Sequence, residues 1–215
     1  MKKLMTLSEF NELPHDIKDG IRQGIEDGFN QWQAIRAMAA SLTPEPLCYD
    51  NTTHCNAIQD HIQGRLKTIF ADNADIKIDK FKDDVLGLLY KGVAFIRFNK
   101  LSEDFKPKTK LTPSHQKYLD QDPDLPGLPS TATILFAGYI PDAVMSTIRA
   151  INVVCWAADG LEWVYDYSSQ TGTEQTGLGF APTVPDSPIV EIGKTASKSR
   201  ISKKVNKKKT ESDTQ

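Results

Sequence analysis

Arg97 is the residue whose position in the sequence most strongly suggests a chemical role. It lies inside the apolar run 93–98, which is typical of a buried strand, and Lys100 follows shortly after. A buried guanidinium is costly unless a partner satisfies it, so either a structural ion pair or a binding site is expected here. The expected partners are carboxylates close in the sequence or in a later hairpin: Glu103, Asp104, Glu162 and Asp166.

Two cysteines and two histidines lie close enough together to raise the question of a zinc site. They fall within fourteen residues: Cys48, His54, Cys55 and His61. Structural zinc is held by Cys and His side chains in tetrahedral sets. His54 and Cys55 are adjacent, however, so their side chains diverge unless the backbone folds sharply, and the spacing matches no standard motif. The sequence therefore favours no bound metal and no cofactor.

Other catalytic patterns are weak. Cys155 lies in the apolar segment VVCW, where a cysteine is usually a small buried hydrophobic residue rather than a nucleophile. No glycine-rich phosphate loop follows a strand. A metal-dependent nuclease needs acidic residues at strand ends with a lysine nearby, and the residues that would serve it are Asp84, Asp104 and Lys106. The sequence favours a protein without enzymatic activity and leaves this nuclease as an alternative.

Charge is distributed unevenly along the chain. The segment 194–209 carries eight Lys and Arg residues and no acid, so the remaining 18 basic residues face 28 Asp and Glu residues, a net charge of −10. A basic run without a folded scaffold binds nucleic acid in a salt-sensitive way and without sequence preference. Non-specific nucleic-acid contact is therefore expected from the lysines of the tail: Lys203, Lys204, Lys207, Lys208 and Lys209.

The spacing of hydrophobic residues predicts the elements that position these side chains. Apolar residues recur at three- and four-residue steps from Ile17 through Ile35 to Met38, which predicts one long helix with a buried stripe. A second helix is predicted over 56–72, and three regularly spaced glycines in the first helix predict close packing. Strands follow, joined in one case by a turn at Lys91-Gly92. Their predicted ranges are 76–81, 85–90, 93–98, 133–139, 148–157 and 161–167.

These elements predict an α+β fold in which N-terminal helices pack on an antiparallel sheet of about five to six strands. Residues 1–74 form the helical part and 75–168 the sheet part of the same domain. The remainder, 169–215, is predicted to be a disordered tail, basic at 194–209. The excursion at 102–131 is long for a compact domain and is expected to carry a helical turn near Tyr118.

The bulk sequence also predicts the compartment. No apolar run approaches the roughly 20 residues that span a bilayer, and the N-terminus lacks the pattern of a secretory signal. Three cysteines, widely spread, do not make a disulfide framework. We therefore expect a cytoplasmic protein without membrane contact.

Four segments resemble an uncharacterised family of bacterial proteins over about residues 75–167. The segments are FIRFNKLSEDFKPK, TPSHQKYLDQDPDLPGLP, AGYIPDA and VVCWAADGLEWVYDY. The matching positions are Arg97, Phe98, Lys100, Leu101, Asp104, Gln116, Pro126, Gly127, Gly138, Tyr139 and Trp163. Members of that family are often encoded beside helix-turn-helix proteins with an ImmA/IrrE-like peptidase domain. The resemblance implies a partner-binding component of a toxin–antitoxin-like or phage-defence two-gene module, with its protein partner encoded nearby.

Six of these residues are expected to form the partner- or ligand-binding surface: Arg97, Lys100, Asp104, Gln116, Tyr139 and Trp163. Substitutions separate this hypothesis from the nuclease. A partner-binding protein should tolerate Asp104→Asn and loss of the tail better than Arg97→Ala. A nuclease should lose its activity with Asp104→Asn while remaining folded. Partner capture, DNA cleavage and circular dichroism of the variants distinguish the two, and cleavage abolished in folded Asp104→Asn would contradict partner binding as the main function.

Overall fold

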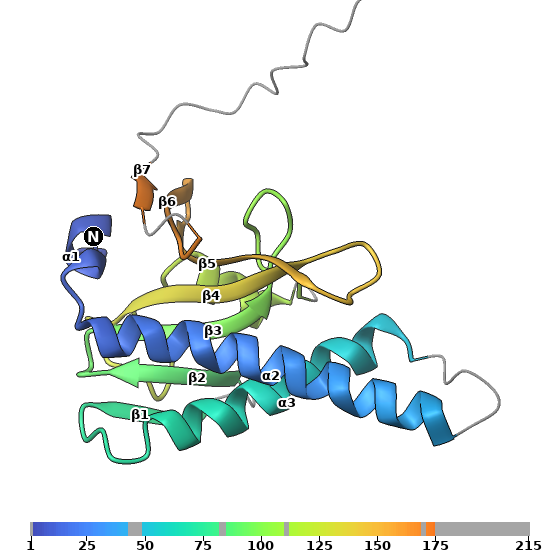
Figure 1. Ribbon diagram of the computed structural model, residues 1–215. Coiled ribbons are helices and arrows are strands. Elements are labelled where there is room, and N and C mark those ends of the chain that lie inside the picture. Colours follow the sequence, from blue (N-terminus) through green and yellow to red (C-terminus); the bar gives the residue numbers. More distant parts are fainter. Residues whose placement is uncertain (1, 43–48, 82–84, 110–111, 169–170, 175–215) are drawn as a thin grey trace, which may run out of the picture. The chain divides into compact units, whose positions relative to one another are not determined.

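Four helices and seven strands make up the part of the chain described by the computed structural model (Figure 1). The described residues are 2–42, 49–81, 85–109, 112–168 and 171–174. The helices are α1 (Leu7–Asn11), α2 (His15–Leu42), α3 (Asn51–Ile69) and α4 (Pro113–Leu119). The strands are β1 (Ile76–Phe81), β2 (Val85–Tyr90), β3 (Ala94–Lys100), β4 (Thr133–Pro141), β5 (Ile148–Ala157), β6 (Gly160–Asp166) and β7 (Thr171–Glu174).

All seven strands lie in one sheet, in the order of the sequence. The α+β class is confirmed, and six of the strands lie inside the predicted sheet region. The prediction of a purely antiparallel sheet is wrong at one pair, because β3 and β4 run parallel, with Ala94 beside Thr133 and Lys100 beside Tyr139. Residues 171–174, predicted to belong to the tail, pair with β6. The rest of the predicted tail, including 194–209, lies outside the described residues.

The parallel pair accounts for the long excursion between β3 and β4. Two parallel neighbours cannot be joined by a tight turn, since the chain must return along the sheet, which takes a dozen or more residues. This crossover, residues 101–132, contains α4 and confirms the predicted helical turn near Tyr118. Thr112 caps α4 by accepting a hydrogen bond from the His115 N–H at 3.1 Å, and Pro113 occupies the first turn.

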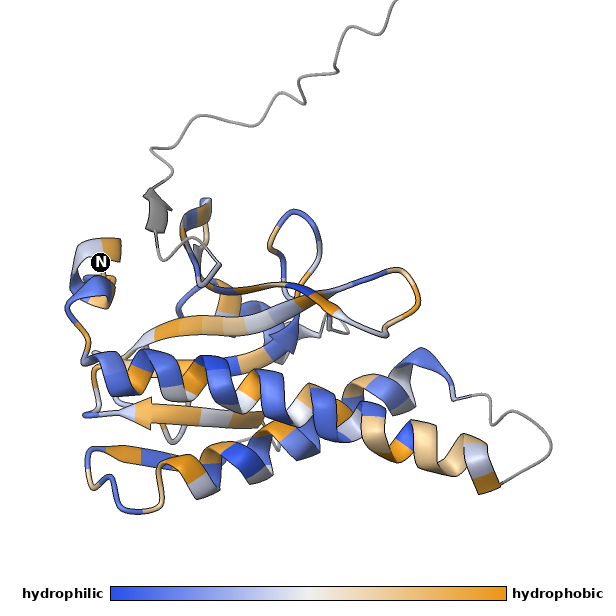
Figure 2. Ribbon diagram, in the orientation of Figure 1, coloured by the Kyte–Doolittle hydropathy of each residue, from blue (hydrophilic) through white to orange (hydrophobic). Residues whose placement is uncertain are grey.

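The two faces of the sheet are covered by different parts of the chain. Ile96 and Phe98 of β3 pack in the core formed with α1, α2 and α3, whereas Phe95 packs with the crossover residues Tyr118 and Leu119. The central strand β4 is buried along its whole length, and Figure 2 shows hydrophobic residues along it. A strand covered on both faces needs a nearly continuous apolar sequence, which β4 has.

Helices α2 and α3 pack closely because glycines of α2 face α3. A Cβ added at Gly24 would lie 2.5 Å from the Leu66 side chain, and one at Gly28 would lie 2.5 Å from the Ile62 backbone nitrogen. The close packing predicted from the glycine spacing is therefore confirmed. Among the described residues no helix, including the 28-residue α2, is both long enough and apolar enough to cross a membrane.

Two details of the predicted elements are wrong at their ends. The buried stripe of α2 ends at Trp32, and Ile35 and Met38 are 39% and 64% exposed, because the last turns of α2 extend past β2 and β3 (Figure 1). Val93, predicted to begin a strand, belongs instead to the turn after β2 and is 46% exposed. Lys91 and Gly92 take φ values of 48° and 72° in this turn, so the predicted hairpin itself is confirmed.

Gln121 attaches the crossover to the sheet. Its buried side chain donates to the carbonyl oxygens of Ile134 and Trp156, each at 2.7 Å, and accepts from the Ile134 N–H at 2.8 Å. The carboxamide thus substitutes for a neighbouring strand where β4 begins. It also joins β4 to the end of β5, so one side chain positions three segments.

The glycine contact between α2 and α3 gives a prediction with an internal control. Gly28→Ala should lower the free energy of unfolding by about 1–3 kcal/mol, because the new methyl group meets backbone rather than a flexible side chain. Gly64→Ala, within α3, places its Cβ in open space and should raise stability by about 0.5–1 kcal/mol through helix propensity. Urea unfolding measures both. A stabilised Gly28→Ala protein would contradict the helix packing.

Candidate functional site

A cleft of about 750 Å³ opens between the first half of α3 and the ends of β3 and β4. We refer to it as the α3–β3 cleft. Most of its lining residues are of polar or charged type, although their apolar atoms supply more of its surface than their polar atoms, and it lies where the two parallel strands end together. The residues that line it are Asn51, Thr52, Cys55, Asn56, Gln59, Ile62, Phe98, Asn99, Lys100, Lys108, Thr109 and Tyr139.

Helix α3 forms one wall of the cleft. Asp50 caps α3 and accepts the Thr53 N–H at 2.6 Å, which fixes where the helix begins. His54, Ile58 and Ile62 are buried, and they recur at four-residue steps along one side of the helix. The cleft side chains lie at neighbouring helical positions: Thr52, Cys55, Asn56 and Gln59.

A short β-bridge builds the opposite wall. Leu101 pairs with Pro107, and the Lys108 N–H donates to the Lys100 carbonyl oxygen at 2.8 Å. The chain therefore turns back immediately after β3 and places Lys108 beside Lys100. Two lysines separated by seven intervening residues thus line the same cleft.

The cleft carries the positive charges of Lys100 and Lys108. The charge of Lys108 also reaches the exposed Asp104, outside the cleft, and helps to lower the pKa of that carboxyl group. None of the residues that line the cleft is Asp or Glu, and neither Lys100 nor Lys108 forms an ion pair with any described residue. The polar contact of the Lys100 ammonium group is weak, to the Met145 sulfur at 3.4 Å. Burial raises the pKa of the Cys55 thiol, and the charges of Lys100 and Lys108 act in the opposite direction. Both lysines therefore lie within electrostatic range of the same sulfur.

Amide and phenol groups complete the wall. Gln59 donates to the Phe98 carbonyl oxygen at 3.3 Å, which joins α3 to β3. The carboxamide oxygen of Asn99 is buried and accepts no hydrogen bond. Burial raises the pKa of Tyr139 far above its usual range, so its hydroxyl keeps its proton at neutral pH. The Tyr139 ring packs edge-on against Phe29, with 5.5 Å between centroids.

The structure brings together only two of the six residues predicted to form one binding surface. Lys100 and Tyr139 share the α3–β3 cleft. Asp104 is exposed in the loop after β3, and Gln116 is exposed on α4, where it donates to Asp120 at 2.8 Å. The Trp163 indole donates to the Met5 carbonyl oxygen at 2.8 Å and packs on Phe10.

Arg97 is buried, but its partners are not the predicted carboxylates. Its guanidinium lies over the Tyr118 ring, 4.3 Å from the centroid, and its Nη1 donates to His115 Nδ1 at 3.1 Å. Within the described residues no carboxylate pairs with it, and Glu103 pairs with Arg149 instead. Cation–π packing and the imidazole nitrogen satisfy the guanidinium in place of an ion pair. Replacing Arg97 would therefore disturb the core as well as any partner binding.

The residues weighed as metal ligands or nucleophiles have other roles. His54 is buried and accepts the Trp32 indole N–H at 3.0 Å, and Cys155 is buried, as predicted, which raises its pKa to about 12. Cys48 lies outside the described residues. The described residues hold no group of three or more His, Cys, Asp or Glu side chains fit to bind a metal ion. Of the nuclease candidates, Lys106 is exposed and Asp84 lies outside the described residues.

Comparison with protein-family models, with curated proteins and with solved structures finds no match to the chain. The resemblance to the bacterial family described above therefore stays a prediction.

Several residues of the cleft could not be identified from sequence. The polar positions of α3 show the helical spacing that such a wall requires, but any solvated helix face has the same spacing. Lys108 joins the cleft only through the bridge between Leu101 and Pro107, and no local pattern marks it. Asn99 lies between Phe98 and Lys100, and no pattern distinguishes it from other polar residues near a strand end.

The contact between Arg97 and His115 predicts how stability changes with pH. Burial, followed by the charge of Arg97, lowers the pKa of His115 to about 4 from 6.5. Between these values the unfolded chain binds more protons than the folded protein, so stability is full above about pH 6.5 and falls as the pH drops towards 4. His115→Asn keeps an acceptor near the Nδ1 position but cannot be protonated. Its stability should fall less than that of the wild type between about pH 7 and about pH 5.

Urea unfolding at the two pH values measures this difference. All other residues are the same in both proteins, so their contributions cancel in the comparison. Equal losses of stability in the wild type and in His115→Asn would contradict a neutral, buried His115.

Proposed function

We propose that this protein is a non-enzymatic binding component that engages a protein partner through the α3–β3 cleft. The observation that carries the proposal is the pair of lysines, Lys100 and Lys108, in a cleft whose described lining residues include no Asp or Glu. Charged groups left without partners on a folded surface are suited to recognition, since complementary charge on a partner increases association rate and specificity.

The side chains of the cleft that could do chemistry also favour binding over catalysis. Activated nucleophiles have a lowered pKa or an adjacent base, whereas burial raises the pKa of Cys55. The hydroxyl of Tyr139 keeps its proton for the same reason. A general base poised near neutral pH is absent from the residues that line the cleft.

The predicted context is consistent with this proposal. In a toxin–antitoxin-like or phage-defence two-gene module, one member acts by contact with the other and needs no chemistry of its own. The resemblance that implies such a module includes Lys100, Leu101, Gly138 and Tyr139, which lie at or beside the cleft. The partner would then be the protein encoded nearby.

Nucleic acid is the second candidate, favoured by the eight basic residues of 194–209. The remainder of the chain has a net charge of −10, which repels a polyanion over most of its surface. Binding through the basic segment alone would be salt-sensitive and independent of the cleft. Substitutions in the cleft and deletion of 194–209 therefore distinguish the two candidate functions.

The experiment is affinity purification of the full chain from its native cells, with half of each sample treated with nuclease. Asn56→Trp fills the cleft from an exposed position of α3 without changing charge. We expect it to reduce capture of a stoichiometric protein partner at least about tenfold, by steric exclusion from the cleft. Thr68→Trp, exposed on the same helix but outside the cleft, is the matched control and should capture normally.

Recovery of the same partner by wild type, Asn56→Trp and Thr68→Trp would overturn the proposal. Recovery of nucleic acid alone, lost when residues 194–209 are deleted, would establish the second candidate in its place. Circular dichroism of both Trp variants confirms that they are folded before capture is compared.

A further inference from the structure

We propose that the α3–β3 cleft is a receptor for carboxylate groups, in which Lys100 and Lys108 bind an acidic segment of the protein partner. This inference rests on the proposed function and specifies the chemistry of the partner. It is argued from the charge, the hydrogen-bonding groups and the size of the cleft.

The first argument is the charge balance inside the cleft. Some basic side chains of the described residues pair with an acid, such as Arg65 with Asp27 at 2.6 Å and Lys91 with Asp75 at 3.0 Å. Others, Lys67, Lys100 and Lys108 among them, form no ion pair with a described residue, and Lys100 and Lys108 are distinguished by lining one cleft together. Two ammonium groups in one cleft repel each other, and a bound carboxylate would offset that repulsion.

Hydrogen-bond donors line the cleft together with the two lysines. Asn51 and Thr52 come from the first turn of α3, the helix end that carries partial positive charge. The Asp50 carboxylate opposes this field, but it is engaged as the helix cap with the Thr53 N–H. Asn56, Thr109 and Tyr139 add amide and hydroxyl donors to the wall. A carboxylate accepts several such bonds at once, and charge-assisted bonds are stronger than neutral ones.

The size of the cleft and the charge around it indicate which class of ligand fits. A volume of about 750 Å³ accommodates several side chains of a peptide rather than one small ion. The acidic body of the chain disfavours a long polyphosphate ligand, which would extend beyond the cleft over like charge. A short acidic segment places its charge only where the lysines are. These features favour an acidic peptide over nucleic acid.

The test measures binding of a hexaglutamate peptide by isothermal titration calorimetry. The protein is the full chain with the eight Lys and Arg residues of 194–209 replaced by Gln, so that the basic segment cannot bind the peptide. Lys100→Gln and Lys108→Gln should each weaken binding about tenfold, the effect of losing one charge-assisted contact. Lys108 is exposed, so its replacement leaves the core intact.

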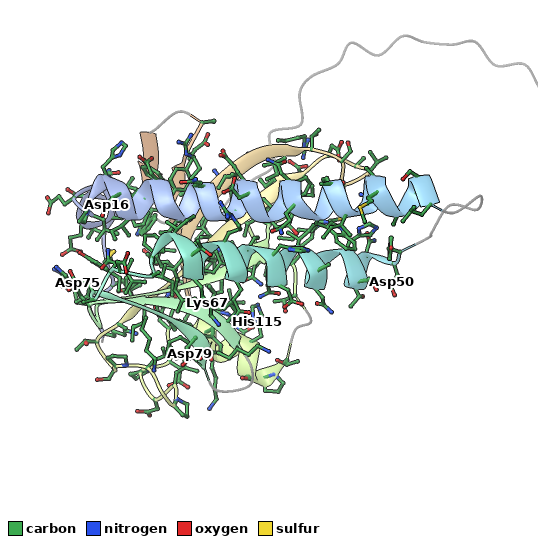
Figure 3. All side chains as sticks on the ribbon, turned by 60° about the horizontal axis from the view of Figure 1, so that its bottom comes forward. Asp16, Asp50, Lys67, Asp75, Asp79 and His115 are labelled. Atoms are coloured by element: carbon green, nitrogen blue, oxygen red, sulfur yellow. The ribbon has the colours of Figure 1, made fainter. Side chains whose placement is uncertain are left out.

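The matched control is Lys67→Gln, which makes the same change of charge on α3. Figure 3 shows Asp50 and Lys67 towards opposite ends of this helix, so the control lies far from the cleft. Lys67→Gln should leave the affinity unchanged, and a hexaglutamine peptide should not bind. Added salt should weaken hexaglutamate binding, because the attraction is screened.

Absence of hexaglutamate binding, or equal weakening by Lys67→Gln and Lys108→Gln, would overturn the inference. Binding of inorganic phosphate or a single-stranded oligonucleotide in preference to hexaglutamate would overturn the choice of carboxylate. If Asn56→Trp blocks partner capture but hexaglutamate does not bind, the proposed function stands and this inference fails. If hexaglutamate binds but Asn56→Trp still captures the partner, the carboxylate site stands and the proposed partner surface fails.

Discussion

The parallel pairing of β3 with β4 is the constraint on which both the fold and the site depend. Because the two strands run in the same direction, the chain must cross from one end of the sheet to the other between them. That crossover buries the second face of the sheet, with Tyr118 and Leu119 of α4 against Phe95. The same pairing places Lys100 beside Tyr139, so the ends of both strands reach one edge of the α3–β3 cleft.

Close backbone approach maintains this arrangement. A side chain at Gly138 would collide with the carbonyl oxygen of Asn99, so β4 carries glycine where it passes the end of β3. Gln121 then holds the crossover against the start of β4. Gln121 and Gly138 therefore fix opposite ends of β4, and Lys100 lies beside the Gly138 end. A rigid frame of this kind lowers the entropic cost of binding, because little has to be ordered when a partner arrives.

The sequence predicted the two long helices, the six strands between 76 and 166 and the α+β class because each rests on local hydrophobic periodicity. It did not predict the short helix α1, and α3 begins at Asn51 rather than at 56. It did not predict the parallel pair, which depends on how distant segments meet, although the long excursion at 102–131 was its visible consequence. Arg97 was predicted to be buried and is buried, but its partners His115 and Tyr118 come from that excursion. The predicted partners were carboxylates close in the sequence or in the last hairpin, but the crossover covers this face of β3 with α4 instead.

Dependence on tertiary structure also explains why the six predicted site residues do not lie together. Lys100 and Tyr139 were chosen from motifs, and strand pairing unites them. Asp104, Gln116 and Trp163 were chosen in the same way, but they lie in a loop, on α4 and against α1. Uncharged residues such as Asn56 and Gln59 can be recognised as part of the cleft only once the structure shows the opposite wall. Sequence thus predicts single residues of a site better than their assembly.

The central claim is that the α3–β3 cleft is the surface that binds, and residue-resolved chemical-shift mapping tests it most directly. The isotopically labelled full chain is titrated with hexaglutamate, and backbone amide shifts are followed residue by residue. The account predicts that shifts in the body of the chain concentrate in 51–59 and 99–109, on the two walls of the cleft. Shifts confined to 194–209, or centred on α4 or on Trp163, would contradict it.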